Sequence, residues 1–239
     1  MTEGIGRRLL AELLGTAALT AAVVGSGIMA QRLSPGDAGL QLLQITVATV
    51  LALGALVTVL GPVSGAHLNP VVSLADWWTS RRGGGGLRGQ DAAAYIAAQV
   101  LGAGSGAVLA NAMFAVPTAV ATTSRGGAGQ LLGEVVATAG LVALVLALVR
   151  TGRTHLAAPA VAAWIGSAIW FTSSTAFANP AVTVGRALSD TATGIAPGGV
   201  PAYVAAQVVG AVLGVAVIGV LRPRPTPDAA ARGPVAIEV

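Results

Sequence analysis

Two Asn-Pro pairs constrain the fold of this chain more than any other feature. Asn69-Pro70 and Asn179-Pro180 each lie in an apolar stretch, and they are 110 residues apart. Proline lacks the backbone N–H, which costs little in the first turn of a helix but much in its middle. Each pair is therefore predicted to start a helix, with asparagine as the N-cap and proline as the first helical residue.

The chain is apolar enough to lie within a lipid bilayer. Of its 239 residues, 54% are hydrophobic and only 9% are charged. A transmembrane helix needs about 20 predominantly apolar residues. Six stretches approach or exceed that length, at residues 9–30, 40–60, 91–114, 130–149, 156–171 and 200–221. We therefore expect an all-α membrane protein with six transmembrane helices.

The helix starts at the Asn-Pro pairs would then lie within the membrane. Irregular backbone at that depth is tolerated only where it is buried in protein or lines a water-filled cavity. Two half-helices starting there would present free N–H groups and asparagine amides to whatever passes. A pore constriction is therefore expected at Asn69, Pro70, Asn179, Pro180 and Ala181.

An internal repeat divides the chain into two halves. Residues 95–103 and 203–211 agree at seven of nine positions and are 108 residues apart. With three spans in each half, the second half (130–221) must enter the membrane from the side opposite to the first (1–114). We therefore expect residues 1–239 to form one channel domain built as an inverted repeat, with residues 222–239 as a cytoplasmic tail.

The basic residues, all of them arginine, predict the orientation. In a six-span chain that starts inside, ten arginines fall on the cytoplasmic side and three, Arg32, Arg125 and Arg186, on the other. Cytoplasmic loops of membrane proteins carry an excess of basic residues. Both termini are therefore expected in the cytoplasm and the protein in the plasma (inner) membrane. The basic charge then reflects topology, and no nucleic-acid partner is expected.

The sequence argues against an enzyme. Cysteine is absent and the two histidines are far apart, so neither a thiolate nor a histidine metal site is expected. The sequence also contains no nucleophile–base pair and no phosphate-binding loop. We expect no cofactor and no catalytic residue.

Five segments recur in an order that resembles the aquaporins and aquaglyceroporins, the major intrinsic protein superfamily. They are Ala11-Glu12-x-x-Gly15-Thr16, Ser64-Gly-Ala-His-Leu-Asn-Pro-Val-Val72, Ala98-Gln99-x-x-Gly102-Ala103, Glu134-x-x-x-Thr138 and Asn179-Pro180-Ala181. The resemblance implies six spans, two re-entrant half-helices and one pore per protomer of a homotetramer. It also implies that Glu12 and Glu134 hold the re-entrant loops, whereas intramembrane carboxylates in general often relay protons or couple ions.

The chain departs from the family at one position of the second motif. Most members have Asn-Pro-Ala-Arg, whereas this chain has Val182 after Ala181. Counted from the two asparagines without gaps, the four filter positions of the family fall on Thr49, Ser167, Ala176 and Val182. Such a ring should be wider than one closed by arginine, and diameter, lining donors and charge set selectivity. The filter resembles that of arsenic-associated bacterial members, which implies passage of arsenous acid or methylated arsenicals.

Two further residues are expected in the vestibules of the pore. Arg186 lies four residues after Val182, on the same helix face and about 5.4 Å further out. It would carry positive charge in the outer vestibule, either free or as a surface ion pair with Asp190. The resemblance implies that His67 lies in the cytoplasmic vestibule, where a pH gate is an alternative role.

The favoured function is passive passage of small neutral solutes such as metalloid hydroxides, glycerol-like polyols and water. A water-selective channel and a general glycerol facilitator are alternatives within the same fold. A secondary active transporter can also have inverted repeats and broken helices, but it usually couples through ionisable groups near its site. A cation channel would need acidic rings at its mouth.

Overall fold

The computed structural model describes residues 3–81 and 85–221, so the expected tail at 222–239 lies outside the described residues. Within those ranges the chain is helical and has no strand. The long helices are α1 (Ile5–Leu33), α2 (Ala38–Ser64), α4 (Gly89–Met113), α5 (Ala128–Arg150), α6 (Ala157–Phe171) and α8 (Val200–Leu221). Each lies in a helical segment long and apolar enough to cross a membrane. The predicted all-α, six-span architecture is confirmed.

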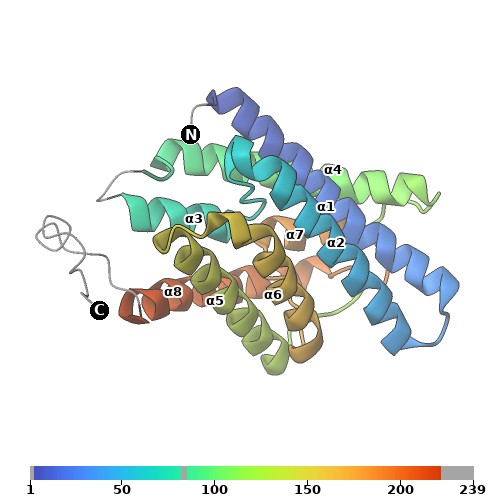
Figure 1. Cartoon of the computed structure of the whole chain (residues 1–239). Helices are drawn as coiled ribbons and strands as arrows, with labels where there is room; N and C mark the ends of the chain where they lie inside the picture. Colours follow the sequence, from blue (N-terminus) through green and yellow to red (C-terminus); the bar gives the residue numbers. More distant parts are fainter. Residues whose placement is uncertain (1–2, 82–84, 222–239) are drawn as a thin grey trace, which may run out of the picture.

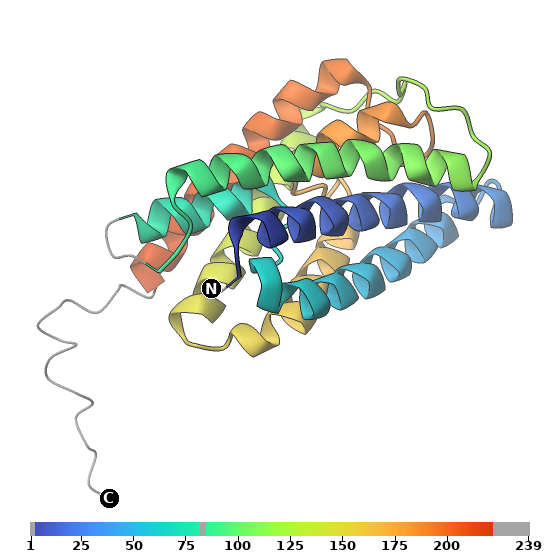
Figure 2. The same cartoon turned by 90° about the horizontal axis from the view of Figure 1, so that it is seen from above.

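Two short helices, α3 (Pro70–Ser80) and α7 (Pro180–Gly185), interrupt the long ones at equivalent places. The first and last long helices of each half pack along each other, α1 with α4 and α5 with α8 (Figures 1 and 2). The halves join where α2 packs against α6, where α3 packs against α8 and where α7 packs against α4. Each half-helix therefore contacts the last helix of the other half.

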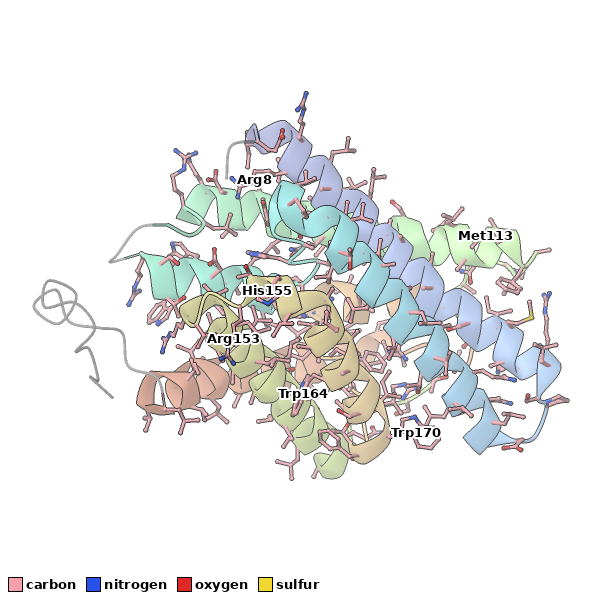
Figure 3. The ribbon with its side chains drawn as sticks, in the orientation of Figure 1. Arg8, Met113, Arg153, His155, Trp164 and Trp170 are labelled. Carbon is pink, nitrogen blue, oxygen red and sulfur yellow. The ribbon has the colours of Figure 1, made fainter. Side chains whose placement is uncertain are left out.

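The chain ends of the bundle lie on one side. The start of α1 and the end of α8 lie at the same end, which we call the terminal end (Figure 1). Arg8, Arg153 and His155 lie toward it, whereas Met113 and Trp170 lie toward the opposite, far end (Figure 3). This arrangement is what an even number of spans requires.

Glycines allow the closest helix contacts. A Cβ atom on Gly106 of α4 would lie 2.1 Å from the carbonyl oxygen of Ala17 in α1. At the repeat-equivalent Gly214, it would lie 2.5 Å from the carbonyl oxygen of Ala139 in α5. Real Cβ atoms do not approach backbone this closely, so both helix pairs depend on glycine at these positions.

Gly106→Ala is expected to lower the thermal midpoint of the purified protein. The added methyl group must push α4 away from the α1 backbone, and overpacking of this kind costs about 1–3 kcal/mol. Gly104→Ala is the matched control on the same helix, because its Cβ would lie 3.6 Å from a side-chain carbon of Leu188. Equal midpoints for the two variants in a detergent melting experiment would contradict this packing.

Candidate functional site

Both half-helices begin at an asparagine. Asn69 and Asn179 have extended backbone and are followed by proline at the first helical position. The side-chain oxygen of each accepts a hydrogen bond from the backbone N–H two residues on, at 3.1 Å in both cases. The asparagines therefore cap α3 and α7, which fixes the position of each amide at the helix start.

The same asparagines connect the two halves of the chain. The Nδ2 atom of Asn69 donates to the carbonyl oxygen of Ala178 at 2.8 Å, and Nδ2 of Asn179 donates to that of Leu68 at 2.8 Å. Each side-chain amide has a second N–H. Because both residues also line a cavity, this second donor is available to a molecule within it.

The two re-entrant loops have the same unusual backbone. Ala66 and Leu68 have φ of +46° and +49°, and Ala176 and Ala178 both have +46°. These are equivalent positions, three residues and one residue before each asparagine. A non-glycine residue in this region costs about 1–3 kcal/mol and persists only where its surroundings fix it.

Glu12 fixes the first loop from α1. Its Oε1 accepts from the backbone N–H of His67 at 3.0 Å, and its Oε2 accepts from that of Leu68 at 2.7 Å. Gln99 of α4 donates to the same Oε2 at 2.7 Å, and the Glu12 side chain is fully buried. The carboxylate thereby holds backbone N–H groups that a strained loop leaves unpaired.

Glu134 fixes the second loop in the same way from α5. Its two oxygens accept from the backbone N–H groups of Phe177 and Ala178, both at 2.8 Å. Gln207 of α8 donates to Oε2 at 2.6 Å, and Glu134 is also fully buried. Both carboxylates thus have the hydrogen-bond geometry of loop-holding groups.

A cavity of about 760 Å³ runs between the halves and is lined by both asparagines. Along α2 its lining extends from Leu42 to Pro62. At 1.5 Å per residue this is about 30 Å, the thickness of the hydrocarbon core of a bilayer. Asp76 and His155 line it toward the terminal end, and Arg186 lines it toward the far end. The cavity is therefore a candidate pore.

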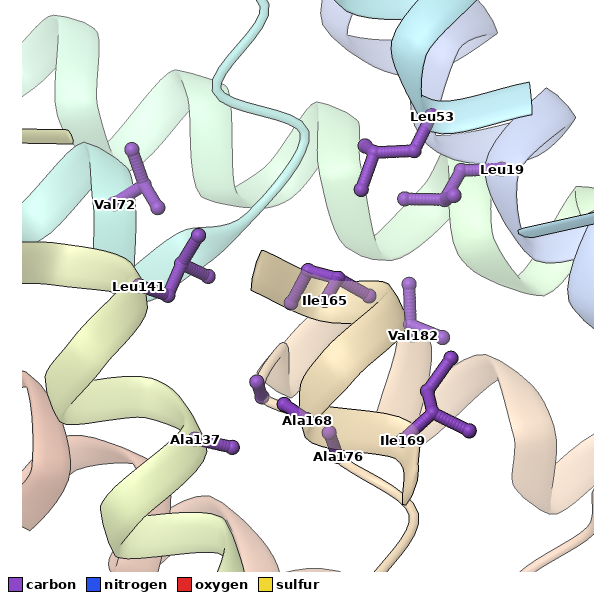
Figure 4. Close-up of a cluster of buried hydrophobic side chains, with 11 residues drawn as sticks. Leu19, Leu53, Val72, Ala137, Leu141, Ile165, Ala168, Ile169, Ala176 and Val182 are labelled. Atoms are coloured by element: carbon purple, nitrogen blue, oxygen red, sulfur yellow. The ribbon is translucent and has the colours of Figure 1, made fainter. Parts of the chain in front are cut away.

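Thr49, Ile169, Ala176 and Val182 are among the residues that line this cavity, and we call these four the filter ring. Ile169, Ala176 and Val182 belong to one buried cluster (Figure 4). Thr49 lies one turn from Leu53 of the same cluster, and its hydroxyl has no hydrogen-bond partner among the described residues. The side chains of the ring are therefore apolar except for the hydroxyl of Thr49.

The family model described as Major intrinsic protein matches residues 2–176. The chain belongs to this family. As a major intrinsic protein with six membrane-spanning segments, it is an integral membrane channel and not an enzyme.

Individual proteins give the same assignment. Aquaglyceroporin AqpS of Rhizobium meliloti (strain 1021) is 48% identical over 214 residues, which cover 89% of this chain and 88% of that protein. Aquaporin-2 of Equus caballus is 41% identical over 103 residues, 43% of this chain and 85% of that sequence. The X-ray structure of the aquaglyceroporin from Plasmodium falciparum superposes with a TM-score of 0.73. The superposition covers 92% of this chain and 98% of that chain, and the two sequences are 21% identical. At this identity the likeness shows a shared fold and nothing more.

The structure corrects one filter position of this major intrinsic protein. Ser167 is exposed on the outside of α6, and its hydroxyl donates to the carbonyl oxygen of Trp164 in its own helix. Ile165 and Ile169 line the cavity instead. Successive helical residues are about 100° apart around the helix axis. Ile165 and Ile169 therefore share one face of α6, and Ser167, midway between them, points to the opposite face. Counting backward from Asn179 without gaps therefore fails across the loop.

Arg186 lines the far end of the pore but is buried rather than exposed. Only 6% of its surface is accessible, its guanidinium lies 3.3 Å from the ring centre of Phe177, and Nε donates to the carbonyl oxygen of Thr193. Arg125, from the segment between α4 and α5, lies 5.2 Å from the same ring and also lines the cavity. We call this end of the cavity, formed by Arg125, Phe177, Arg186 and Thr193, the arginine mouth.

Of the two alternatives for Arg186, the surface ion pair with Asp190 is wrong. Asp190 accepts from the backbone N–H and the hydroxyl of Thr122, at 2.8 and 2.9 Å. Both hydrogen bonds lower the pKa of the Asp190 carboxyl, and the one from the backbone N–H has the larger effect. Asp190 therefore ties one surface loop to another. The helix that would have carried it one turn above Arg186 ends at Leu188, and the next residues leave the helical path.

His67 lies in the first re-entrant loop and lines the cavity. Its Nδ1 is 3.1 Å from the hydroxyl of Ser73, and its ring packs edge-on against the ring of Tyr95.

Sequence reasoning did not assign roles to Gln99 and Gln207, which donate hydrogen bonds to the Glu12 and Glu134 carboxylates. The repeat that contains both glutamines was the feature that could have revealed them.

Proposed function

We propose that this channel conducts small neutral solutes passively and in both directions. The proposed solutes are metalloid hydroxides such as arsenous acid, methylated arsenicals, glycerol-like polyols and water. The observation that carries this proposal is Val182 in the filter ring, in the first turn of α7 and 4% exposed. A short aliphatic side chain there leaves open the space that an arginine side chain would occupy.

The composition of the ring favours solutes with apolar surface. Ile169, Ala176 and Val182 offer no hydrogen bond, and the hydroxyl of Thr49 offers one site. A solute that crosses must give up hydration, and this costs more for a small, fully polar molecule than for one with CH or CH₃ groups. Glycerol-like and methylated solutes fit that chemistry better than a water-only role.

The centre of the pore opposes cations. The N-termini of α3 and α7 meet there, and the partial positive charge of each helix start points at the cavity. The two asparagine amides add donors that orient a passing water molecule with its oxygen toward them. Proton and metal-ion currents are therefore not expected.

Transport coupled to an ion gradient has less support. A coupling carboxylate must change its partners during the cycle, whereas Glu12 and Glu134 each accept from two backbone N–H groups and a glutamine. A cation channel is disfavoured by the arginine mouth. The water-selective and general glycerol-facilitator alternatives differ from our proposal only in the filter.

The proposal includes the setting of the channel. It acts in the plasma (inner) membrane as a homotetramer with one pore per protomer, as the family resemblance implies. The terminal end faces the cytoplasm, since most arginines fall on that side of a six-span chain.

Reconstituted protein is expected to speed equilibration of glycerol and arsenous acid along their gradients. Shrinkage and reswelling of proteoliposomes measure glycerol and water flux, and retained arsenic is measured after rapid filtration. Neither solute should accumulate against its gradient when a proton or sodium gradient is imposed, and no ionic current should appear in planar bilayers. If water alone crosses faster than in empty liposomes, the proposed wide filter is wrong.

A further inference from the structure

Two cations share one aromatic ring at the arginine mouth. Arg186 and Arg125 come from segments far apart in sequence, yet both guanidinium groups lie over Phe177, at 3.3 and 5.2 Å. Cation–π attraction compensates part of the desolvation of each charge. It does not neutralise them, so the lining of the cavity keeps a net positive charge here.

Neither arginine has a carboxylate partner within the part of the chain that the structure describes. In the described ranges 3–81 and 85–221, the ion pairs are Arg7 with Glu3 and Arg88 with Asp91. Two acidic groups from neighbouring segments have other partners: Asp190 accepts from Thr122, and Glu134 accepts from the second re-entrant loop.

Donors of both guanidinium groups remain unused. Arg186 donates through Nε to the Thr193 carbonyl, and no residue in the described ranges accepts from its two Nη atoms. Arg125 donates through Nε to the carbonyl oxygen of Gly194 at 2.8 Å and through Nη2 to that of Ala192 at 3.0 Å. Its guanidinium lies beside the hydroxyl of Tyr203, and no backbone or carboxylate oxygen of the described residues accepts from its Nη1. Arg186 is more than nine-tenths buried, and a buried charge without an opposite charge is unfavourable.

We propose that the arginine mouth is a binding site for a small monovalent oxyanion, such as a carboxylate or a sulfonate. The planar guanidinium group matches the paired oxygens of such an anion, which would accept from the Nη atoms of Arg186 and from Nη1 of Arg125. One negative charge suits the site because the Glu134 carboxylate, bonded to the N–H of Phe177, already offsets one of the two cations.

The bound anion would stop at the mouth. To go further it must enter the filter ring, where the hydroxyl of Thr49 is the side-chain donor and the other members are aliphatic. Removing the hydration of an ion at such a place is far more costly than for a neutral solute. Because both arginines line the cavity, an anion in the site would narrow the path of neutral solutes and slow their passage.

Methanesulfonate is the test probe, since it remains ionised throughout the working pH range, and dimethyl sulfone is its neutral counterpart of similar shape. Methanesulfonate should raise the thermal midpoint of the detergent-purified protein in a saturable manner, because a ligand that binds only the folded state stabilises it. Dimethyl sulfone should not. Arg186→Gln and Arg125→Gln should each abolish or strongly reduce the shift.

Arg32→Gln is the matched control, because Arg32 also lies at the far end but stacks on Phe114 and does not line the cavity. It should retain the full shift. Should Arg186→Gln fail to fold, Arg125→Gln still tests the site. A shift that dimethyl sulfone reproduces, or that persists in Arg125→Gln, would overturn the proposal.

A flux measurement forms the second arm and rests on the proposed function. Methanesulfonate on both sides of proteoliposomes should reduce glycerol flux at least twofold in the parent protein and leave it unchanged in Arg125→Gln. The two arms separate the hypotheses. An arginine-dependent thermal shift in a protein that does not conduct glycerol supports the anion site and refutes the solute assignment. Glycerol flux without any such shift supports the solute assignment and refutes the anion site.

Discussion

Val182→Arg is expected to reduce the flux of glycerol, arsenous acid and methylated arsenicals by about tenfold relative to water, which corresponds to about 1.4 kcal/mol at the barrier. Val182 lies in the first turn of α7, lines the cavity and belongs to the same buried cluster as Ile169. A long cationic donor there fills the opening and supplies hydrogen bonds suited to water. Larger solutes lose clearance first. Parallel water and solute flux on the same proteoliposomes gives the ratio.

Arg186→Ala is the companion variant. It removes a positive charge from the mouth but leaves the width of the filter ring unchanged, so it should not lower the ratio of solute to water flux. If Val182→Arg is folded and inserted yet leaves that ratio unchanged, Val182 does not line the constriction and the proposed filter is wrong.

Glu12→Ala is expected to destabilise the protein more than any other single truncation discussed above. It removes the acceptor for the backbone N–H groups of His67 and Leu68 and for the side chains of Ser64 and Gln99. Each buried donor left without a partner costs about 1–3 kcal/mol. A large drop in thermal midpoint is expected, with loss of the strained loop conformation.

Glu12→Gln separates a loop-holding role from a proton-relay role. Glutamine keeps one acceptor oxygen, but its NH₂ group must face at least one of the donors that the carboxylate satisfies. We therefore expect the thermal midpoint of Glu12→Gln to lie between those of the parent protein and Glu12→Ala. The folded fraction should retain flux. A Gln variant with parental stability and no flux would indicate instead that Glu12 must change protonation during transport.

Much of the fold could be predicted because a few residues determine it locally. Proline is favoured at the first position of a helix and is costly in its middle, so Pro70 and Pro180, each after a capping asparagine, marked the starts of α3 and α7. The apolar stretches gave the spans, since the bilayer sets their length. The inverted repeat followed from the order of the spans and was visible in the matching segments around Gln99 and Gln207.

The errors arose where position depends on geometry between elements. Ser167 was assigned by counting through the segment between α6 and α7, and an offset of two residues turns a helical side chain to the opposite face. Asp190 was assigned by assuming that the helix after Val182 continues. Arg125 was missed as a pore residue because nothing in its own segment indicates that the loop folds back over Phe177.

The exchange of hydrogen bonds between Asn69 and Ala178 and between Asn179 and Leu68 has a consequence for biogenesis. The acceptor for Asn69 lies 109 residues later in the chain, and at about 5–20 residues per second the ribosome reaches it roughly 5–20 s afterwards. Until then the newly made first half holds an unpaired amide at membrane depth. We therefore expect the first half to stay incompletely assembled until the second half is made, and a chain truncated after the first half to seek that complement in another copy.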